Sequence, residues 1–231
     1  MTVVLVHGFW LGAWVWDTVR PALAAAGHST VALTLPGLHP EDADRATVSL
    51  EDHIAAVVGA IDAANDPVVL VGHSAGGAVA HAAAARRPGR VTRVVHVDTW
   101  PAAEGRSIAA DLPQENGEIA LPPWEMFDEE DLVDLDDSLR AVLRGRSVPQ
   151  PARTATDTFT YSGTDRLSVP TTVIACEFSP AQLQEWAAGG APNLAELASL
   201  TDLTWMHVPT GHWPMLTRPD ELAAALVAAL D

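Results

Sequence analysis

Ser74 lies at the centre of Gly72-His73-Ser74-Ala75-Gly76, with a glycine two residues before it and another two residues after it. An apolar run precedes this pentapeptide and an alanine-rich segment follows, so we predict a tight turn from a strand into a helix. In such a turn the serine takes strained backbone angles, and the two glycines avoid clashes. The helix dipole there favours developing negative charge on the hydroxyl. We predict that Ser74 is a nucleophile; the alternative is a glycine-rich turn that serves only for packing.

A serine nucleophile needs a general base within hydrogen-bonding reach. Of the nine histidines, His212 has the most suitable position because its loop, residues 210–214, follows the last predicted strand. Loops at the carboxyl ends of parallel strands share one edge of the sheet, so we predict that His212 is the base. His73 lies inside the serine turn and is expected to point away from Ser74. His96 lies within a strand, where we expect a hydrogen-bonded core histidine.

The third member of such a site is a carboxylate that orients the base and stabilises its charged form. Asp98 follows the predicted strand 91–97, and Glu177 follows the predicted strand 171–175. Asp98 is favoured because no arginine adjacent in the sequence accounts for it, and Glu177 is the runner-up. Asp165 is a distant third candidate.

Acyl transfer also needs two backbone N–H groups that stabilise the oxyanion of the tetrahedral intermediate. We predict that one belongs to Ala75, directly after the nucleophile. The other is expected from Phe9, because Gly8 lets the loop after the first strand bend close to the site. The ring of His7 is predicted to hydrogen-bond the backbone of this loop and fix the donor, rather than act as a base.

These residues must be positioned by alternating strands and helices. Strands are predicted at 2–6, 29–35, 68–71, 91–97, 171–175 and 204–208, and the clearest helices at 14–26, 49–64, 75–87 and 219–230. This alternation predicts an α/β fold with a mostly parallel six-stranded sheet and helices on both faces. Residues 1–231 are read as one domain. An insertion at about 100–168, between strands four and five, is expected to form a small lid.

Tryptophans gather near the predicted site residues. Trp10, Trp100 and Trp213 each follow a proposed site residue within three positions, and Trp124 falls in the lid. A tryptophan offers a rigid apolar wall with one hydrogen-bond donor, so we predict that these four bind a bulky apolar or aromatic group. Core packing is the alternative for some of them. The acidic run 128–137 in the lid is expected to be a solvated helix face.

The composition limits the partners. Acidic residues outnumber basic ones by 30 to 13, every basic residue is arginine, and the formal net charge is −17, which disfavours nucleic acid. The absence of lysine excludes a Walker phosphate-binding loop. We expect no membrane span, no signal peptide, no metal and no cofactor. The single cysteine, Cys176, cannot form an internal disulfide, so a reducing cytoplasmic location is expected. The oligomeric state is left open.

Taken together, these motifs resemble the α/β-hydrolase superfamily over nearly the whole chain. The stretch Val6-His7-Gly8-Phe9-Trp10-Leu11-Gly12-Ala13-Trp14 looks like the small six-stranded esterases that include plant methylesterases and hydroxynitrile lyases. The resemblance implies the order nucleophile, acid, base, with the acid usually an aspartate after the penultimate strand. Here that place reads Glu177-Phe178, and Asp98 occupies the strand tip that haloalkane dehalogenases use. The lyases have a lysine beside the catalytic histidine, where this chain has Trp213.

We therefore predict a serine hydrolase that cleaves a carboxylic ester, thioester or lactone through an acyl-enzyme. One alternative is a lyase or cofactor-free oxygenase in which Ser74 and His212 only transfer protons. Another is a non-catalytic module that binds a small ligand.

Overall fold

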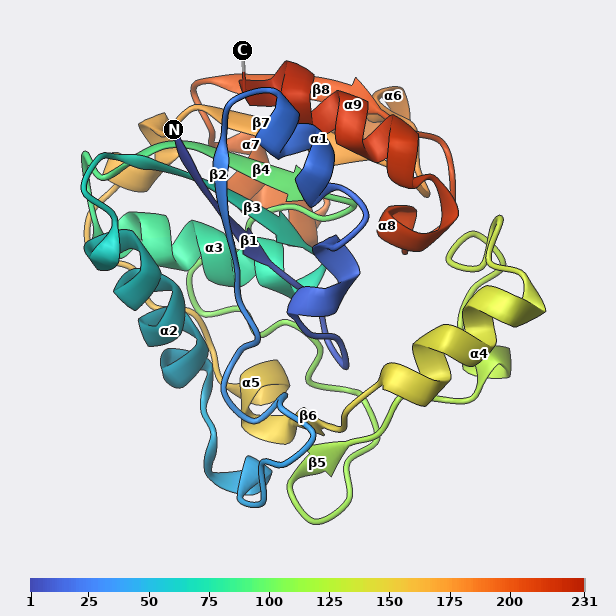
Figure 1. Cartoon of the computed structure of the whole chain (residues 1–231). Coiled ribbons are helices and arrows are strands. Elements are labelled where there is room, and N and C mark those ends of the chain that lie inside the picture. Colours follow the sequence, from blue (N-terminus) through green and yellow to red (C-terminus); the bar gives the residue numbers. More distant parts are fainter. Residues whose placement is uncertain (231) are drawn as a thin grey trace.

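The computed structural model describes residues 1–230 and contains a six-stranded sheet in the order β2-β1-β3-β4-β7-β8 (Figure 1). All neighbouring strands in this sheet pair in parallel. The strands span β1 Thr2–Val6, β2 Ser29–Ala32, β3 Val68–His73, β4 Val91–Val97, β7 Thr171–Ala175 and β8 Leu203–His207. The predicted fold class, a parallel six-stranded sheet with helices on both faces, is confirmed.

The helices cover the sheet from both sides. The α-helices span α1 Arg20–Ala25, α2 Leu50–Ala63, α3 Ala75–Arg86, α4 Asp137–Arg146, α5 Ala152–Thr156, α6 Pro180–Ala188, α7 Ala195–Ala198, α8 Pro214–Thr217 and α9 Pro219–Leu230. The predicted helix at 14–26 is instead a 3-10 turn, Ala13–Trp16, followed by α1. Pro21 lies at the start of α1, because a proline lacks the N–H that a helix interior needs.

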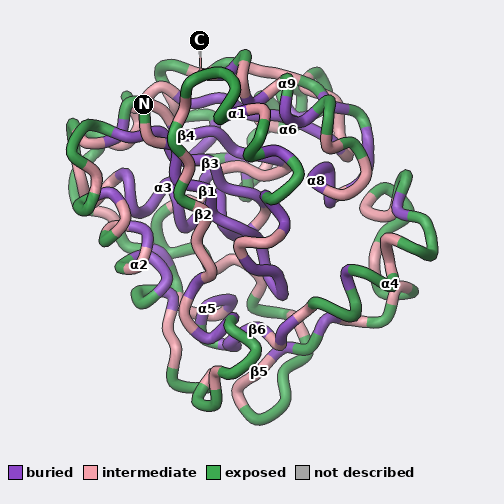
Figure 2. Tube along the Cα trace, in the orientation of Figure 1, coloured by how far each residue is buried: buried purple, intermediate pink, exposed green. Residues whose placement is uncertain are grey.

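The sheet separates the two largest of the three hydrophobic clusters in the described residues. Alternate residues of β1 point to opposite faces, so Val3 and Leu5 join the core that includes α9, whereas Val4 and Val6 join the core beneath α2 and α3. Figure 2 shows the buried residues concentrated along the central strands. All six residues of β3 are buried. The central strands therefore form a rigid base for the turns at their carboxyl ends.

The chain between β4 and β7 lies to one side of this body (Figure 1). It contains the short antiparallel pair β5 (Glu118–Ile119) and β6 (Gln150–Pro151). The helix α4 lies between these two strands in the sequence, and only its Leu143 is buried. The helix α5 follows β6. No described helix is long and apolar enough to cross a membrane.

The turn between β3 and α3 has the strained conformation that its glycines predict. Ser74 has φ 52° and ψ −129°. A side chain at Gly76 would meet the carbonyl oxygen of His7 and lie 2.6 Å from that of Val6. A side chain at Gly72 would lie 2.5 Å from the carbonyl oxygen of Gly76. Both glycines are needed because backbones approach each other too closely for any Cβ atom.

We expect Gly76→Ala to lower the free energy of unfolding by at least about 2 kcal/mol, since the added methyl group overpacks fixed backbone. The matched control is Gly59→Ala in α2, where nothing lies within 4 Å of the added Cβ. Gly59→Ala is expected to raise the free energy of unfolding by roughly 0.5–1 kcal/mol, because glycine is a poor helix former. Urea denaturation compares the two variants. Equal stability of both would contradict the steric account of the turn.

Candidate active site

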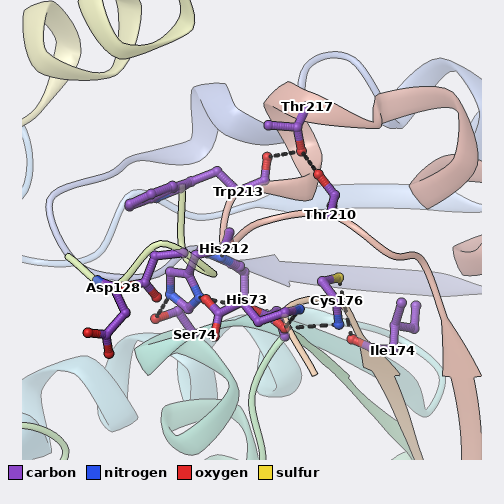
Figure 3. A network of polar contacts seen from close by, with 12 residues as sticks. His73, Ser74, Asp128, Ile174, Cys176, Thr210, His212, Trp213 and Thr217 are labelled. Atoms are coloured by element: carbon purple, nitrogen blue, oxygen red, sulfur yellow. Dashed lines mark hydrogen bonds and ion pairs between the residues drawn. The ribbon is translucent and has the colours of Figure 1, made fainter. Parts of the chain in front are cut away.

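Ser74, His212 and Asp98 form a continuous chain of hydrogen bonds at the carboxyl edge of the sheet. Figure 3 shows His212 beside Ser74. The Nδ1 atom of His212 lies 2.7 Å from Oδ2 of Asp98, and its Nε2 atom lies 2.9 Å from Oγ of Ser74. Because the carboxylate can only accept, Nδ1 carries the proton and donates it to Asp98. The Nε2 atom is then free to accept from the serine hydroxyl. This arrangement suits His212 to remove the proton of Ser74.

Asp98 is fixed by the neighbouring strand as well as by His212. It follows β4 with φ 49°, and its Oδ1 atom accepts hydrogen bonds from the backbone N–H groups of Cys176 at 3.0 Å and Glu177 at 3.1 Å. Burial by itself raises the pKa of Asp98, but the hydrogen bond and positive charge of His212 outweigh burial and hold that pKa below its usual value. Asp98 is therefore set up to stay ionised beside the imidazole.

Glu177 reaches the same nitrogen atom. Its Oε1 atom lies 2.7 Å from Nδ1 of His212, yet it has no hydrogen bond of acceptable geometry and is buried. Burial is the main reason why the pKa of Glu177 rises to about 8. The structure thus brings both acid candidates to one imidazole, with the aligned hydrogen bond going to Asp98. Asp165 lies elsewhere, in a 3-10 turn that lines a separate hollow with Arg166.

Two acidic side chains around one imidazole shift its pKa. Burial lowers the pKa of His212, but the side chains of Asp98 and Glu177 outweigh this effect and raise the pKa. The imidazolium that forms when His212 takes a proton is thereby stabilised. The side-chain oxygen and nitrogen atoms of Asp98, Glu177 and His212 also lie within 4.8 Å of one another. Among residues 1–230, this is the one group of three or more His, Cys, Asp or Glu side chains close enough to hold a metal ion. In the structure these atoms instead face each other as hydrogen-bonding and ion-pair partners.

The loop after β1 lies against the serine. As predicted, the ring of His7 bonds this loop: its Nδ1 atom donates to the carbonyl of Gly8 at 2.7 Å, and its Nε2 atom accepts the N–H of Leu35 at 3.1 Å. A side chain on Gly8 would lie 2.8 Å from Cβ of Ser74, so glycine permits this approach. Phe9 and Ala75, the two predicted oxyanion donors, follow Gly8 and Ser74 directly.

Of two further buried histidines, one contacts His212 and the other differs from its sequence expectation. The ring of His73 lies beside that of His212, and its Nε2 atom donates to the carbonyl oxygen of His212 at 2.6 Å. His73 therefore supports the base, a role for which its position within the turn gave no signal. His96 is buried in the core as predicted, but the predicted hydrogen bonds are wrong. Neither of its ring nitrogens has a partner among the described residues, and burial lowers its pKa to about 3.

A pocket of about 310 Å³ opens at the serine. Residues that line it include Ser74, His212, Asp98 and Glu177, together with Trp100, Ala75, Ala78, Ala102, Arg106, Ile108 and Asn193. Of the four tryptophans predicted to bind substrate, the structure brings only Trp100 into this lining. Its wall is a mixture of small apolar groups and a few polar ones.

The other three tryptophans pack where the insertion meets the body. Trp213 is buried and contacts Trp124 and Phe127 edge to face, with ring centroids 6.1 and 5.5 Å away. Trp10 is buried beside Phe127 and donates its indole N–H to the carbonyl of Ile119 at 2.9 Å. Packing of these rings against their aromatic neighbours accounts for their positions, and their contact with substrate stays a prediction. The backbone N–H of Trp10 also donates to the buried side chain of Gln150, which no motif pointed to.

A model of the alpha/beta hydrolase family matches residues 3–225. Since the match covers nearly the whole chain, the chain belongs to the alpha/beta hydrolase family. Solved structures agree in fold. An extracellular alpha/beta-hydrolase from a Paenibacillus species has a TM-score of 0.79 at 23% identity, covering 99% of this chain and 98% of that one. A methylesterase from Arabidopsis has a TM-score of 0.76 at 18% identity, covering 100% and 98%.

The most similar sequences include a carbendazim-hydrolysing esterase from Nocardioides sp. (strain SG-4G). It is 38% identical over 122 residues, which make up 52% of this chain and 48% of that protein. The alignment thus spans less than half of that relative, and the same holds for a probable esterase from rice, at 43%. Methylesterase 7 from Arabidopsis thaliana is 28% identical over an alignment of 256 positions, which covers 99% of this chain and 95% of that one.

The raised pKa of Glu177 predicts a pH-dependent stability. The folded chain keeps the proton up to about pH 8, whereas the unfolded chain releases it near the ordinary value of 4.5. The stability that this proton provides is complete below pH 4.5 and is lost as the pH rises toward 8. Between pH 5 and 8, we expect the free energy of unfolding to fall more steeply in the wild type than in Glu177→Gln, by up to about 1.4 kcal/mol per pH unit.

The exposed Glu185→Gln serves as the control and should keep the wild-type slope. Denaturant titrations at several pH values measure these slopes. A variant Glu177→Gln with the same slope as the wild type would show that Glu177 binds no extra proton in the folded state.

Proposed function

We propose that this protein is a serine hydrolase that cleaves a carboxylic ester, thioester or lactone through an acyl-enzyme intermediate. The observation that carries the proposal is the hydrogen-bonded series Ser74–His212–Asp98, with distances of 2.9 and 2.7 Å. Ser74 lies in the strained turn that exposes its oxygen, and the pocket opens directly on it. Esterases and methylesterases among the relatives support the same reaction class.

In the proposed first step, Oγ of Ser74 attacks the carbonyl carbon while Nε2 of His212 takes the hydroxyl proton. The negative charge that develops on the carbonyl oxygen is held by the backbone N–H groups of Phe9 and Ala75. Loss of one such donor costs roughly 3 kcal/mol in related chemistry. The imidazolium then protonates the leaving oxygen or sulfur, and the acyl group remains on Ser74.

In the second step, His212 removes a proton from water, and the resulting hydroxide attacks the acyl carbon. The tetrahedral intermediate collapses, the acid leaves, and the proton returns to Ser74. Asp98 keeps the proton of His212 on Nδ1 and stabilises the imidazolium in both steps. We assign this role to Asp98 rather than Glu177 because only Asp98 makes the aligned hydrogen bond.

We further propose that the substrate carries a bulky apolar or aromatic group. The support is the pocket lining, where Trp100 and Ile108 join several alanines. Within one domain of residues 1–231, the insertion at about 100–168 would act as a lid. A cytoplasmic location stays a prediction that rests on the lone cysteine.

A fluorophosphonate probe is expected to label the wild type on Ser74, because the probe's phosphorus captures an activated serine oxygen. Mass spectrometry of the digested protein locates the label. Ser74→Ala should give no adduct and no ester hydrolysis above background. Near-normal turnover by Ser74→Ala would instead favour the alternative in which Ser74 only transfers a proton.

The two acid candidates separate by substitution. Asp98→Asn is expected to lower kcat for p-nitrophenyl acetate by roughly a thousandfold or more, since an asparagine no longer holds the required tautomer of His212. Glu177 lies beside the same Nδ1 atom of His212, but Glu177→Gln should lower kcat less than tenfold. Circular dichroism confirms that both variants fold. A larger loss for Glu177→Gln would reverse the assignment.

A further inference from the structure

The acidic segment 128–136 of the insertion lies against the loop that carries His212. Residues 129–134 form turns, so the predicted helix is wrong here, whereas most acidic residues of the run are exposed to solvent, as predicted. The carbonyl oxygen of Asp131 accepts the backbone N–H of His212 at 2.9 Å, and that of Val133 accepts the N–H of Gly211 at 3.1 Å. Two consecutive amides of the base's loop are therefore bound by the lid. We call residues 128–136 the docking segment.

Side chains fasten the docking segment to the body at a second point. Asp134, which has φ 61°, accepts hydrogen bonds from the hydroxyl of Thr210 and the guanidinium of Arg218, both at 3.0 Å. The hydroxyl of Thr210 also contacts that of Thr217 at 2.8 Å (Figure 3). Asp134 thus joins the segment to the loop before His212 and to the end of α8.

Gly211 shows how close this contact is. A Cβ atom there would lie 2.7 Å from the carbonyl oxygen and 2.8 Å from the nitrogen of Val133, and would also meet the carbonyl oxygen of Asp131. All three atoms belong to the docking segment. Gly211 is not among the glycines with positive φ, so its backbone conformation is open to alanine. The docking segment is therefore what requires a glycine at this position.

These contacts complete the support of the base. His212 is held at its ring by Ser74 and Asp98, at its carbonyl by His73, and at its amide by Asp131. The amide contact is the only one of these that comes from the insertion. No residue of the docking segment lines the pocket at Ser74. The segment is thus placed to support the base rather than to touch substrate.

We propose that the docking segment positions His212, so that the active site is assembled only while residues 128–136 are docked. This inference rests on the proposed function, because it assigns the lid a part in aligning the base of that reaction. Asp131 and Val133 act through their backbone carbonyls, and Asp134 is a positioning residue that acts through Thr210 and Arg218. Displacement of the segment would leave the pocket in place and remove the alignment of His212 with Ser74.

The test is Gly211→Ala, which adds one methyl group against the docking segment and leaves Ser74, His212 and Asp98 unchanged. Gly145→Ala is the matched control, because Gly145 lies in α4 of the same insertion with nothing within 4 Å of the added Cβ. We expect Gly211→Ala to speed hydrogen exchange of the amides at 211 and 212 at least tenfold. It should lower kcat for p-nitrophenyl acetate and the rate of fluorophosphonate labelling at least tenfold, with KM changed less than threefold. Gly145→Ala should match the wild type.

A second variant covers the case in which Gly211→Ala does not fold. Asp134→Asn keeps a residue that tolerates positive φ and removes the charge that binds Arg218. It should lower kcat twofold to fivefold, and 1 M NaCl should lower kcat of the wild type but not of this variant.

Faster amide exchange with unchanged kcat and labelling would overturn the inference, and so would amides that stay protected in Gly211→Ala. A fall in melting temperature with normal kcat at 25 °C would show a purely structural contact and overturn it too. A wild type that neither hydrolyses esters nor reacts with the probe would instead reject the proposed function, and the exchange data would still report whether the segment is docked.

Discussion

The proposed active site depends on one imidazole ring that is bonded at both nitrogens. His212 donates to Asp98 and accepts from Ser74, and each partner follows a different strand of the sheet. Ser74 follows β3 and Asp98 follows β4, which are adjacent, while His212 lies beyond β8 at the far edge. Parallel strands end at the same side of a sheet, so residues distant in the sequence meet there. The buried strands keep these ends in place.

Close backbone approach is what makes this geometry possible. Gly8 lets the first loop reach Ser74, Gly76 lets α3 start beneath β1, and Gly211 lets the insertion reach the loop of His212. Ser74 and Asp98 both have positive φ without being glycine, which is unfavourable for such residues. The surrounding hydrogen bonds hold both conformations. Positive φ outside glycine also occurs at Trp10, Asn116 and Asp134. At Ser74 and Asp98 it accompanies side chains whose oxygen atoms bond His212.

Much of this architecture could be predicted from the sequence, because its signals are local. Buried parallel strands are continuous apolar runs, and the strands 91–97 and 171–175 were predicted with the bounds that the structure has. The serine turn has a fixed glycine spacing, and the loop of His212 follows the last strand. The capping box of Ser49 and Asp52, which marks the start of α2, is also local and is present.

Contacts between distant segments could not be predicted in the same way. Asp98 and Glu177 looked like alternatives because each ends a strand, and only the pairing of β4 with β7 shows that they share one nitrogen. The acidic run in the insertion has the composition of a solvated helix. Composition does not reveal backbone carbonyl groups that bind another loop, so the contact with the loop of His212 could not be predicted. Trp10, Trp124 and Trp213 lie near site residues in the sequence, but Trp124 packs against Trp213 and Trp10 packs against Phe127.

The central claim is that the oxygen of Ser74 bonds covalently to the acyl carbon during turnover. The most direct measurement is the mass of the protein after rapid quenching of its reaction with p-nitrophenyl trimethylacetate, whose hindered acyl group slows attack by water. The account predicts one trimethylacetyl group per chain on the peptide that contains Ser74, formed together with one equivalent of nitrophenolate. Sustained release of nitrophenolate with no adduct on that peptide, or with the adduct on another residue, would contradict it.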